Sequence, residues 1–421
     1  MLHINKIRDN RDSYIEQLKI KNFDAFTLID AVIFKDDERK VTQQKADELL
    51  SKANQLAKQI GELYKTGKVA EANILKKESS AIKESSKTLQ TKQGELEKKI
   101  QDILVQIPNI PHPTVTEGKS DADNVTLKEV GAIPTLMEGA KPHWELTSDY
   151  NLIDFELGNK ITGAGFPVYV NKGAKLQRAL ISYFLDKNTD AGYIEYLPPH
   201  LVNEASGFGT GQLPDKEGQM YHAIEDDLYL IPTAEVPVTN FFRDVIVKEF
   251  PIKCTAYTPC FRREAGSYGK EVRGLNRLHQ FDKVEIVQVQ HPEKSYETLD
   301  VMVQHVASIL DELELPYRIL KLCGGDLSFT AALTFDFEVY SAGQERWLEV
   351  SSVSNFESYQ ANRLKLRYKD DNGKTQLCHT LNGSALALPR IYAALIENNQ
   401  TAKGIIIPKA LHPYTGFDII K

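Results

Sequence analysis

None of the chain's 18 prolines occurs before Pro108. Proline breaks helices, so a long segment without it, containing only three glycines, favours long helices. The same segment differs from the rest in charge: residues 1–110 carry 20 basic and 17 acidic side chains, whereas residues 111–421 carry 31 and 41. The sequence therefore predicts two physically different parts, residues 1–110 and residues 111–421.

Apolar and small side chains recur at alternating intervals of three and four residues through the proline-free segment. The first series is Ala46, Leu49, Ala53, Leu56, Ile60 and Leu63, and the second is Ala72, Leu75, Ser79, Ile82, Ser86, Leu89, Gln93, Leu96, Ile100, Ile103 and Ile107. This spacing is typical of a coiled-coil seam. The residues 65–68 between the two series include Gly67 and predict a tight turn. We expect an antiparallel hairpin of two helices, each of roughly 35 residues and about 50 Å long.

Lysine outnumbers glutamate along this hairpin. Between residues 52 and 92 four glutamates stand against nine lysines, which are Lys52, Lys58, Lys65, Lys68, Lys76, Lys77, Lys83, Lys87 and Lys92. Coiled coils most often mediate assembly, which is one interpretation. The other is a nucleic-acid-binding arm, because lysine side chains on a helix suit contacts with phosphate groups.

The remaining residues mix strand and helix signals without a repeating βαβ rhythm. An amphipathic helix is expected at 175–187, and strands at 193–197, 284–289, 335–339 and 347–353. The last two are joined by a short turn at Ser341-Ala342-Gly343, which indicates an antiparallel pair. The predicted fold class is α+β, a helical hairpin followed by a domain built on an antiparallel sheet.

Several classes of protein are excluded or disfavoured. No apolar run approaches the roughly 20 residues that span a bilayer, so no membrane association is expected. The start of the chain lacks the apolar core of a secretory signal, and four cysteines without CxxC spacing suggest reduced thiols, so we expect a cytoplasmic protein. Neither a Walker A sequence nor GxGxxG occurs.

Residues 262–277 contain five basic and two acidic side chains, within a region whose overall balance is acidic. Guanidinium groups bind phosphate through paired hydrogen bonds and keep their charge near neutral pH. This local cluster predicts an anionic substrate such as ATP.

The run from Phe261 to Glu285 resembles motif 2 of class II aminoacyl-tRNA synthetases, and in detail that of the seryl-tRNA synthetase family. It begins Phe-Arg-Arg-Glu, continues Ala-Gly-Ser-Tyr-Gly and ends Arg-Leu-His-Gln-Phe-Asp-Lys-Val-Glu. Four further stretches resemble the family in the same order, so the resemblance covers essentially the whole chain. They are Lys172–Pro199 (motif 1), Thr233–Glu235, Glu349–Ser352, and Asn382–Ser384 leading to Arg390 (motif 3).

The resemblance implies a role for each matching residue. Arg262 and Arg390 are the implied catalytic residues. The implied serine-binding residues are Thr233, Ala234, Glu235, Glu285 and Ser384. The implied ATP-binding residues are Arg262, Arg263, Glu264, Phe281, Glu349, Val350, Ser351, Ser352 and Arg390. Glu349 and Ser352 are also the implied ligands of a Mg²⁺ ion that accompanies ATP.

The same resemblance implies the reaction and the partners. Serine and ATP would give seryl-adenylate and pyrophosphate, and the seryl group would pass to the 3′-terminal ribose of tRNA(Ser), with tRNA(Sec) as an alternative acceptor. Motif 1 implies a homodimer, and the lysine-rich hairpin matches the family's tRNA-binding arm. Two alternatives stay open, a relative that charges a carrier protein and an inactive coiled-coil scaffold.

Single residues also have simpler interpretations. Thr233 could cap the following helix, Glu285 could belong to a structural ion pair, and Phe281 could be a core residue. Glu349 and Ser352 raise a geometric objection, because positions i and i+3 of a regular strand face opposite sides. Joint metal binding therefore predicts a bulge or a strand end between them.

Motif 3 departs from the usual family pattern at two positions, where Ala385 and Pro389 stand in place of glycines. Pro389 is compatible with a helix that begins there, which would put Arg390 at the helix start. Ala385 adopts a positive φ less easily than glycine.

Overall fold

The computed structural model describes residues 1–215, 218–264 and 273–421. It divides into two compact units, one formed by residues 1–19 and 23–108, and the other by residues 20–22 and 109–421. Within the described residues, no helix is long and apolar enough to cross a membrane.

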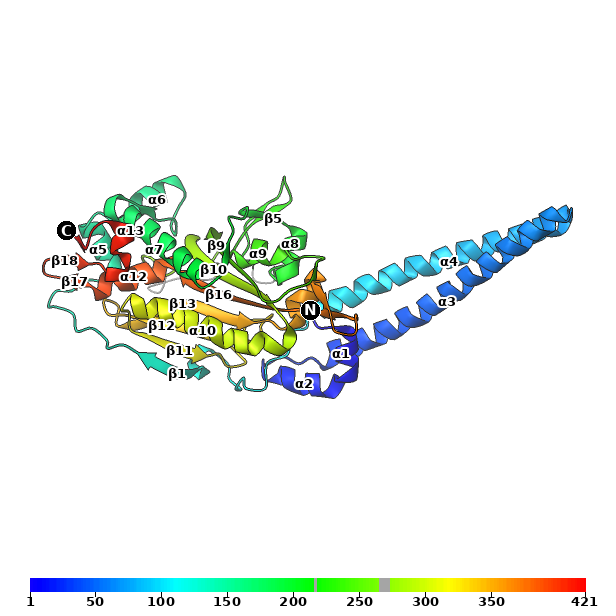
Figure 1. Ribbon diagram of the computed structural model, residues 1–421, viewed down its shortest axis with the longest axis horizontal. Coiled ribbons are helices and arrows are strands. Elements are labelled where there is room, and N and C mark those ends of the chain that lie inside the picture. Colours follow the sequence, from blue (N-terminus) through cyan, green and yellow to red (C-terminus); the bar gives the residue numbers. More distant parts are fainter. Residues whose placement is uncertain (216–217, 265–272) are drawn as a thin grey trace. The chain divides into compact units, whose positions relative to one another are not determined.

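The first unit is helical. Its elements are α1 (Ile4–Asp9), α2 (Arg11–Lys19), α3 (Phe26–Lys65) and α4 (Val69–Leu104). Figure 1 shows α3 and α4, blue to cyan, running side by side as a hairpin. Every residue of both predicted seam series is buried or half-buried, and the turn lies at residues 66–68. The predicted hairpin is therefore confirmed.

A buried carboxylate fixes the base of the hairpin within this unit. Asp36 of α3 is 1% exposed and forms ion pairs with Arg8 of α1 at 2.9 Å, Arg39 at 2.8 Å and Lys40 at 3.0 Å. Burial raises the pKa of Asp36, but hydrogen bonds from Arg39, Lys40 and Arg8 outweigh burial and hold the pKa below its usual value. Asp36 thus ties α1 to α3.

The second unit is organised around an eight-stranded sheet with the strand order β1-β11-β12-β13-β16-β10-β9-β4. Its pairs are antiparallel except for β4 and β9. The strands are β1 (Val125–Val130), β4 (Ile194–Glu195), β9 (Ile252–Phe261), β10 (Gln280–Gln290), β11 (Tyr317–Lys321), β12 (Leu333–Ser341), β13 (Arg346–Asn355) and β16 (His379–Ala387).

Helices and short strands complete the unit. The helices are α5 (His143–Asp149), α6 (Phe155–Ile161), α7 (Asn171–Asp190), α8 (Glu204–Thr210), α9 (Glu235–Asn240), α10 (Ser295–Glu312), α11 (Ser358–Leu364), α12 (Leu388–Asn398) and α13 (His412–Thr415). The short strands are β2 (Ile153–Asp154), β3 (Val168–Tyr169), β5 (Leu201–Asn203), β6 (His222–Ala223), β7 (Leu228–Leu230), β8 (Ile246–Val247), β14 (Arg367–Lys369), β15 (Thr375–Leu377), β17 (Gln400–Thr401), β18 (Gly404–Ile406) and β19 (Ile419–Ile420).

The two faces of the sheet differ, as β10 shows. Val284 and Ile286 enter the main core together with residues of α7, α10 and α12. Because side chains of a strand alternate, Glu285 and Val287 point to the opposite face, where Val287 packs with residues of α9. The sheet therefore has one face in the main core and another that faces α9.

The predicted elements agree with this architecture. The helix expected at 175–187 lies inside α7, and its apolar stripe is buried. The strands expected at 193–197, 284–289, 335–339 and 347–353 coincide with β4, β10, β12 and β13, and the last two form the predicted antiparallel pair. The α+β class and the antiparallel sheet are confirmed.

We predict that Asp36→Asn lowers the free energy of unfolding of the helical unit by about 2 kcal/mol, because it removes charge-assisted hydrogen bonds from a buried site. The exposed neighbour Asp37, which also contacts Arg8 at 2.9 Å, offers a matched control, and Asp37→Asn should cost less than about 1 kcal/mol. Thermal unfolding followed by circular dichroism measures both effects.

The effect should depend on pH with a defined sign. Because the folded state lowers the pKa of Asp36, its contribution is present above the unfolded pKa and is lost as pH falls through the folded pKa. Equal destabilisation by the two variants, or an Asp36→Asn effect that persists undiminished at pH 2, would contradict this role.

Candidate active site

The predicted serine-binding residues come together on the sheet face that packs against α9. Glu285 of β10 and Ser384 of β16 are direct neighbours in the antiparallel register. Thr233 lies just before α9, and its hydroxyl donates to Oε2 of Glu285 at 3.3 Å. Glu235 starts α9. All four side chains are buried, at 2–8% exposure, so any polar ligand held among them would be largely shielded from water.

Glu235 is the most perturbed acid of this group. Burial raises its pKa to about 7, and the nearby charge of Glu285 raises it as well. Hydrogen bonds from Gln360, whose Nε2 lies 2.6 Å from Oε1, and from Asn382 act in the opposite direction, as does the charge of Lys283. A buried carboxyl group that titrates near neutral pH is suited to a cationic ligand group.

The simpler interpretations of Thr233 and Glu285 are also partly realised. The hydroxyl oxygen of Thr233 accepts from the backbone N–H of Glu235 at 3.2 Å, so Thr233 does bond the first turn of α9 while donating to Glu285. Glu285 forms an ion pair with Lys283, at 2.6 Å between Nζ and Oε2. Ala234 is buried in the apolar cluster beneath α9, so only its backbone can contact a ligand.

The geometric objection to Glu349 and Ser352 is answered by a bulge. The register of β12 and β13 shifts so that Glu349 lies opposite Glu338, and Ser351 lies opposite Phe337, with Val350 as the extra residue. Ser352 lies opposite Asp336. Because residues 336 and 338 share one face, Glu349 and Ser352 share it too. The predicted bulge is confirmed.

This bulge gathers acidic groups on the face opposite the core. Oδ1 of Asp336 is buried and, within the described residues, has no hydrogen-bond partner. Burial raises the pKa of Asp336 well above its usual value, and the charge of Glu349 raises it further. Val350 points into the main core, and the buried Ser351 donates to the backbone carbonyl of Ser384 at 2.5 Å.

Arg390 connects three segments of this site. It follows Pro389 in the first turn of α12, as expected, and Ala385 is buried within the extended strand β16. The Nε of Arg390 donates to the carbonyl of Asn276 at 3.1 Å, and its Nη1 donates to the carbonyl of Glu349 at 2.8 Å. Nη1 also lies 3.6 Å from the Glu349 carboxylate. Arg390 therefore fixes Glu349 and the motif 2 segment at Asn276 relative to each other.

Arg262 and Phe281 lie beside each other. The guanidinium of Arg262 lies 5.2 Å from the centre of the half-buried Phe281 ring, and its Nε donates to the carbonyl of Pro232 at 3.3 Å. An aromatic ring beside a guanidinium can bind a planar base and a phosphate group together.

The other motif 2 residues are placed less simply. Arg263 lies over the ring of Tyr221 at 5.3 Å, and Glu264 accepts from Nη1 of Arg277 at 2.8 Å. The Ala-Gly-Ser-Tyr-Gly sequence and the residues up to 272 lie outside the described residues.

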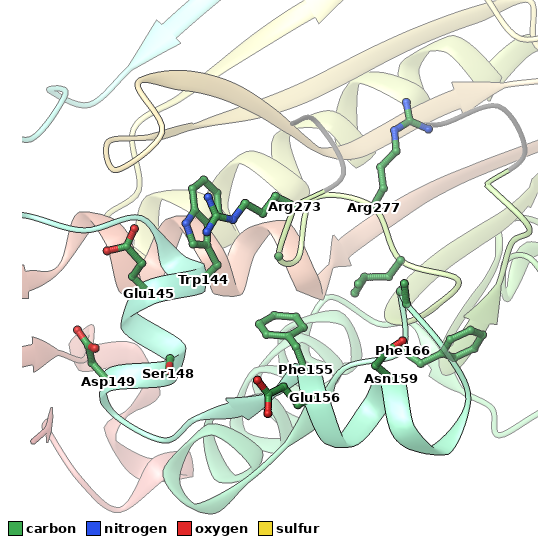
Figure 2. Close-up of a pocket in the computed structure, with 14 residues that line it drawn as sticks. Trp144, Glu145, Ser148, Asp149, Phe155, Glu156, Asn159, Phe166, Arg273 and Arg277 are labelled. Atoms are coloured by element: carbon green, nitrogen blue, oxygen red, sulfur yellow. The ribbon is translucent and has the colours of Figure 1, made fainter. Parts of the chain in front are cut away.

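A cavity of about 650 Å³ opens beside the end of motif 2 and contains none of the predicted site residues. Figure 2 shows Arg273 stacked on Trp144 of α5, at 4.7 Å from the ring centre, with Phe155 and Glu156 of α6 below. Arg277 borders this cavity and also pairs with Glu264. The cavity thus adjoins the predicted ATP site without belonging to it.

Sequence reasoning assigned no role to Lys283, Asp336, Gln360 or Asn382, although Lys283 lies in the motif 2 stretch and Asn382 begins the motif 3 stretch. Lys283 could have been found from strand periodicity, because residues two apart on β10 share the face of Glu285. Gln360 comes from α11, far along the chain, and no local pattern links it to Glu235. Asp336 depends on the register of β12 and β13, which the sequence does not specify.

Comparisons with known proteins identify the domains of the chain. Residues 1–111 match the seryl-tRNA synthetase N-terminal domain, and residues 220–399 match the tRNA synthetase class II core domain (G, H, P, S and T). The serine--tRNA ligase of Salinibacter ruber is 48% identical over 99% of this chain and 98% of its own.

Two solved structures are similar along the whole chain. Seryl-tRNA synthetase from Pyrococcus horikoshii, complexed with ATP, superposes with a TM-score of 0.91 at 32% identity, covering 100% of this chain and 99% of its own. Cytoplasmic serine-tRNA ligase from Naegleria fowleri, in complex with AMP, gives 0.86 at 28% identity with the same coverage. The chain therefore belongs to the seryl-tRNA synthetase family of class II aminoacyl-tRNA synthetases.

Proposed function

We propose that this chain performs the reaction of its family with the residues described above. The protein is an ATP-dependent serine–tRNA ligase of translation, which activates serine and charges tRNA. The observation that best supports the proposed serine site is the proximity of two buried glutamates, Glu235 and Glu285, within residues 220–399, which match the class II core domain. One glutamate can accept hydrogen bonds from the serine ammonium, and the other can accept a hydrogen bond from the side-chain hydroxyl.

The first step needs positioning more than proton transfer. The serine carboxylate is already ionised at pH 7 and attacks the α-phosphate of ATP, and pyrophosphate leaves. In this step Arg262 would hold the serine carboxylate and the α-phosphate together. Phe281 would stack on adenine, and Arg390 would bind the γ-phosphate. In the second step the 3′-terminal ribose hydroxyl of the tRNA attacks the carbonyl carbon, and AMP leaves.

Mg²⁺ fits the acidic face formed by the bulge in β13. The fit rests on the shared face of Glu349 and Ser352 and on the buried Oδ1 of Asp336, which has no hydrogen-bond partner among residues 1–215, 218–264 and 273–421. Among the described residues, no three carboxylate, histidine or cysteine side chains lie close enough to hold a metal alone. Glu349 and Ser352 would thus hold the ion jointly with ATP phosphates, whose charge it would neutralise.

The partners follow from the two units. We assign residues 1–110 as a tRNA-binding arm, because all nine lysines between 52 and 92 are exposed, and residues 111–421 as the catalytic domain. The acceptor is tRNA(Ser), with tRNA(Sec) as the alternative. Exposed apolar side chains in the motif 1 region, Ile194 at 59% and Leu197 at 82%, favour a homodimer. We place the protein in the cytoplasm.

Arg262→Ala should reduce serine-dependent exchange of labelled pyrophosphate into ATP by roughly 10²–10³-fold or more, because it removes charge stabilisation at the reacting phosphate. Arg263→Ala removes the neighbouring arginine, which the resemblance also implies to bind ATP, but we expect a much smaller loss because the Arg263 guanidinium lies over Tyr221. Near-normal exchange by a folded Arg262→Ala variant would refute the assigned role.

Glu235 should give kcat/KM for serine a dependence on pH. Because its pKa is raised to about 7, kcat/KM for serine should rise with pH from 6 to 8 as the carboxylate forms. At saturating serine, kcat should change less, because a bound ammonium favours the ionised form. A kcat/KM that is flat over this range would show that Glu235 does not bind the ammonium.

Replacing Lys76, Lys77, Lys83 and Lys87 of α4 by glutamine should weaken tRNA charging and spare pyrophosphate exchange. If all four contact phosphates, the slope of log affinity against log salt should become less steep by about 3 to 4. Four exposed lysines of the second unit, Lys248, Lys365, Lys374 and Lys403, provide a control of equal charge. Equal losses in both variants would argue against a specific role of the arm.

A further inference from the structure

Lys283 is a buried cation inside the serine pocket that the roles assigned above do not use. Its side chain is 8% exposed, and Nζ lies 2.6 Å from Oε2 of Glu285, whose side chain is 2% exposed. The two residues are two positions apart on β10, so both face α9.

A pair of this kind is a poor explanation for stability. Removing two charges from water costs several kcal/mol per ion, and apolar replacements of buried pairs are often neutral or stabilising. The opposite face of the same strand is apolar, with Val284 and Ile286 in the main core. A charged pair at residues 283 and 285 therefore suggests a functional reason for its presence.

The contacts of Glu285 indicate that reason. Lys283 and the hydroxyl of Thr233 both approach the same oxygen, Oε2. Two donors on Oε2 fix the rotation of the carboxylate. The second oxygen, Oε1, then has a defined direction in the pocket.

We propose that Lys283 is a positioning residue for serine, which fixes the orientation of the Glu285 carboxylate and so holds Oε1 as the acceptor for the substrate's side-chain hydroxyl. The proposal rests on the proposed function and deepens it, because it names what lets the pocket select a hydroxyl-bearing amino acid. A site built to bond a hydroxyl discriminates strongly against an analogue without one, since its polar groups are left unpaired.

Lys283 also acts on the second glutamate. Its charge lowers the pKa of Glu235, although burial and Glu285 together raise that pKa to about 7. The other groups facing this site are the amides of Gln360 and Asn382, the thiol of Cys260 and the guanidinium of Arg262. Burial raises the pKa of Cys260, so its thiol is neutral. Lys283 and Arg262 are therefore the cations of this set.

The test is steady-state pyrophosphate exchange by the full chain with serine and with alanine. Lys283→Met should raise KM for serine by about 100-fold, because it removes the charged hydrogen bond to Glu285. It should also reduce the serine-to-alanine preference, the ratio of the two kcat/KM values, at least 10-fold. KM for ATP should stay within about threefold. The acid limb of kcat/KM for serine should move to higher pH, a shift that a merely structural role would not produce. Lys283→Arg should restore part of the preference.

Controls separate positioning from folding. Lys253→Met removes a half-buried lysine of the neighbouring strand β9, whose Nζ lies over the ring of Tyr193 and away from the two glutamates, and should change neither KM. If Lys283→Met does not fold, Glu285→Gln is compared with the double variant Lys283→Met, Glu285→Gln, which removes both charges. Because Lys283 is proposed to act through Glu285, both variants should fold and show the same loss of preference for serine over alanine.

Two results would overturn the proposal. One is a Lys283→Met enzyme whose KM for serine and serine-to-alanine preference are within threefold of the unmodified protein. The other is a double variant with normal preference. Failure of the proposed function looks different, because the unmodified protein would then show no serine-dependent exchange at all.

Discussion

Two buried carboxylates, Glu235 and Glu285, set the constraint on which the pocket depends. Each must be neutralised, hydrogen-bonded or protonated, because an isolated charge in such a site is costly. The chain meets this need unequally. Glu285 receives a cation and a hydroxyl from Lys283 and Thr233, whereas Glu235 receives amides from Gln360 and Asn382. The result is a pair of acids in different environments, and this difference suits two different groups of one amino acid.

Strand alternation aligns this pocket with the proposed ATP site. Phe281, Lys283 and Glu285 lie on one face of β10, and the distance from the first to the last is about 13 Å at ~3.3 Å per residue. One strand therefore carries both Phe281, which we propose to stack on adenine, and Glu285, which we propose to bind serine. On β13 the bulge at Val350 keeps Glu349 and Ser352 on one face, while Arg390 ties Glu349 to the motif 2 segment at Asn276. The register of the sheet thus fixes the relative positions of the binding groups.

Much of this arrangement could be predicted from the sequence. The hairpin follows from periodicity and the absence of proline, both of which are local properties of residues 1–110. The requirement for a bulge between Glu349 and Ser352 came from geometry alone, once a shared ligand was assumed. The contacts of Glu235 with Gln360, and of Ser352 with Asp336, could not be predicted, because they depend on strand register and on segments far apart in the chain.

We propose that the site formed by Glu235 and Glu285 selects serine by its side-chain hydroxyl. The most direct measurement is amino-acid-dependent pyrophosphate exchange by the unmodified protein with serine, threonine, alanine and cysteine under one set of conditions. We expect kcat/KM for serine to exceed that for alanine by at least about 10³-fold, because alanine has no side-chain hydroxyl to bond Glu285. Comparable exchange with alanine and serine, or exchange with none of the four, would contradict it.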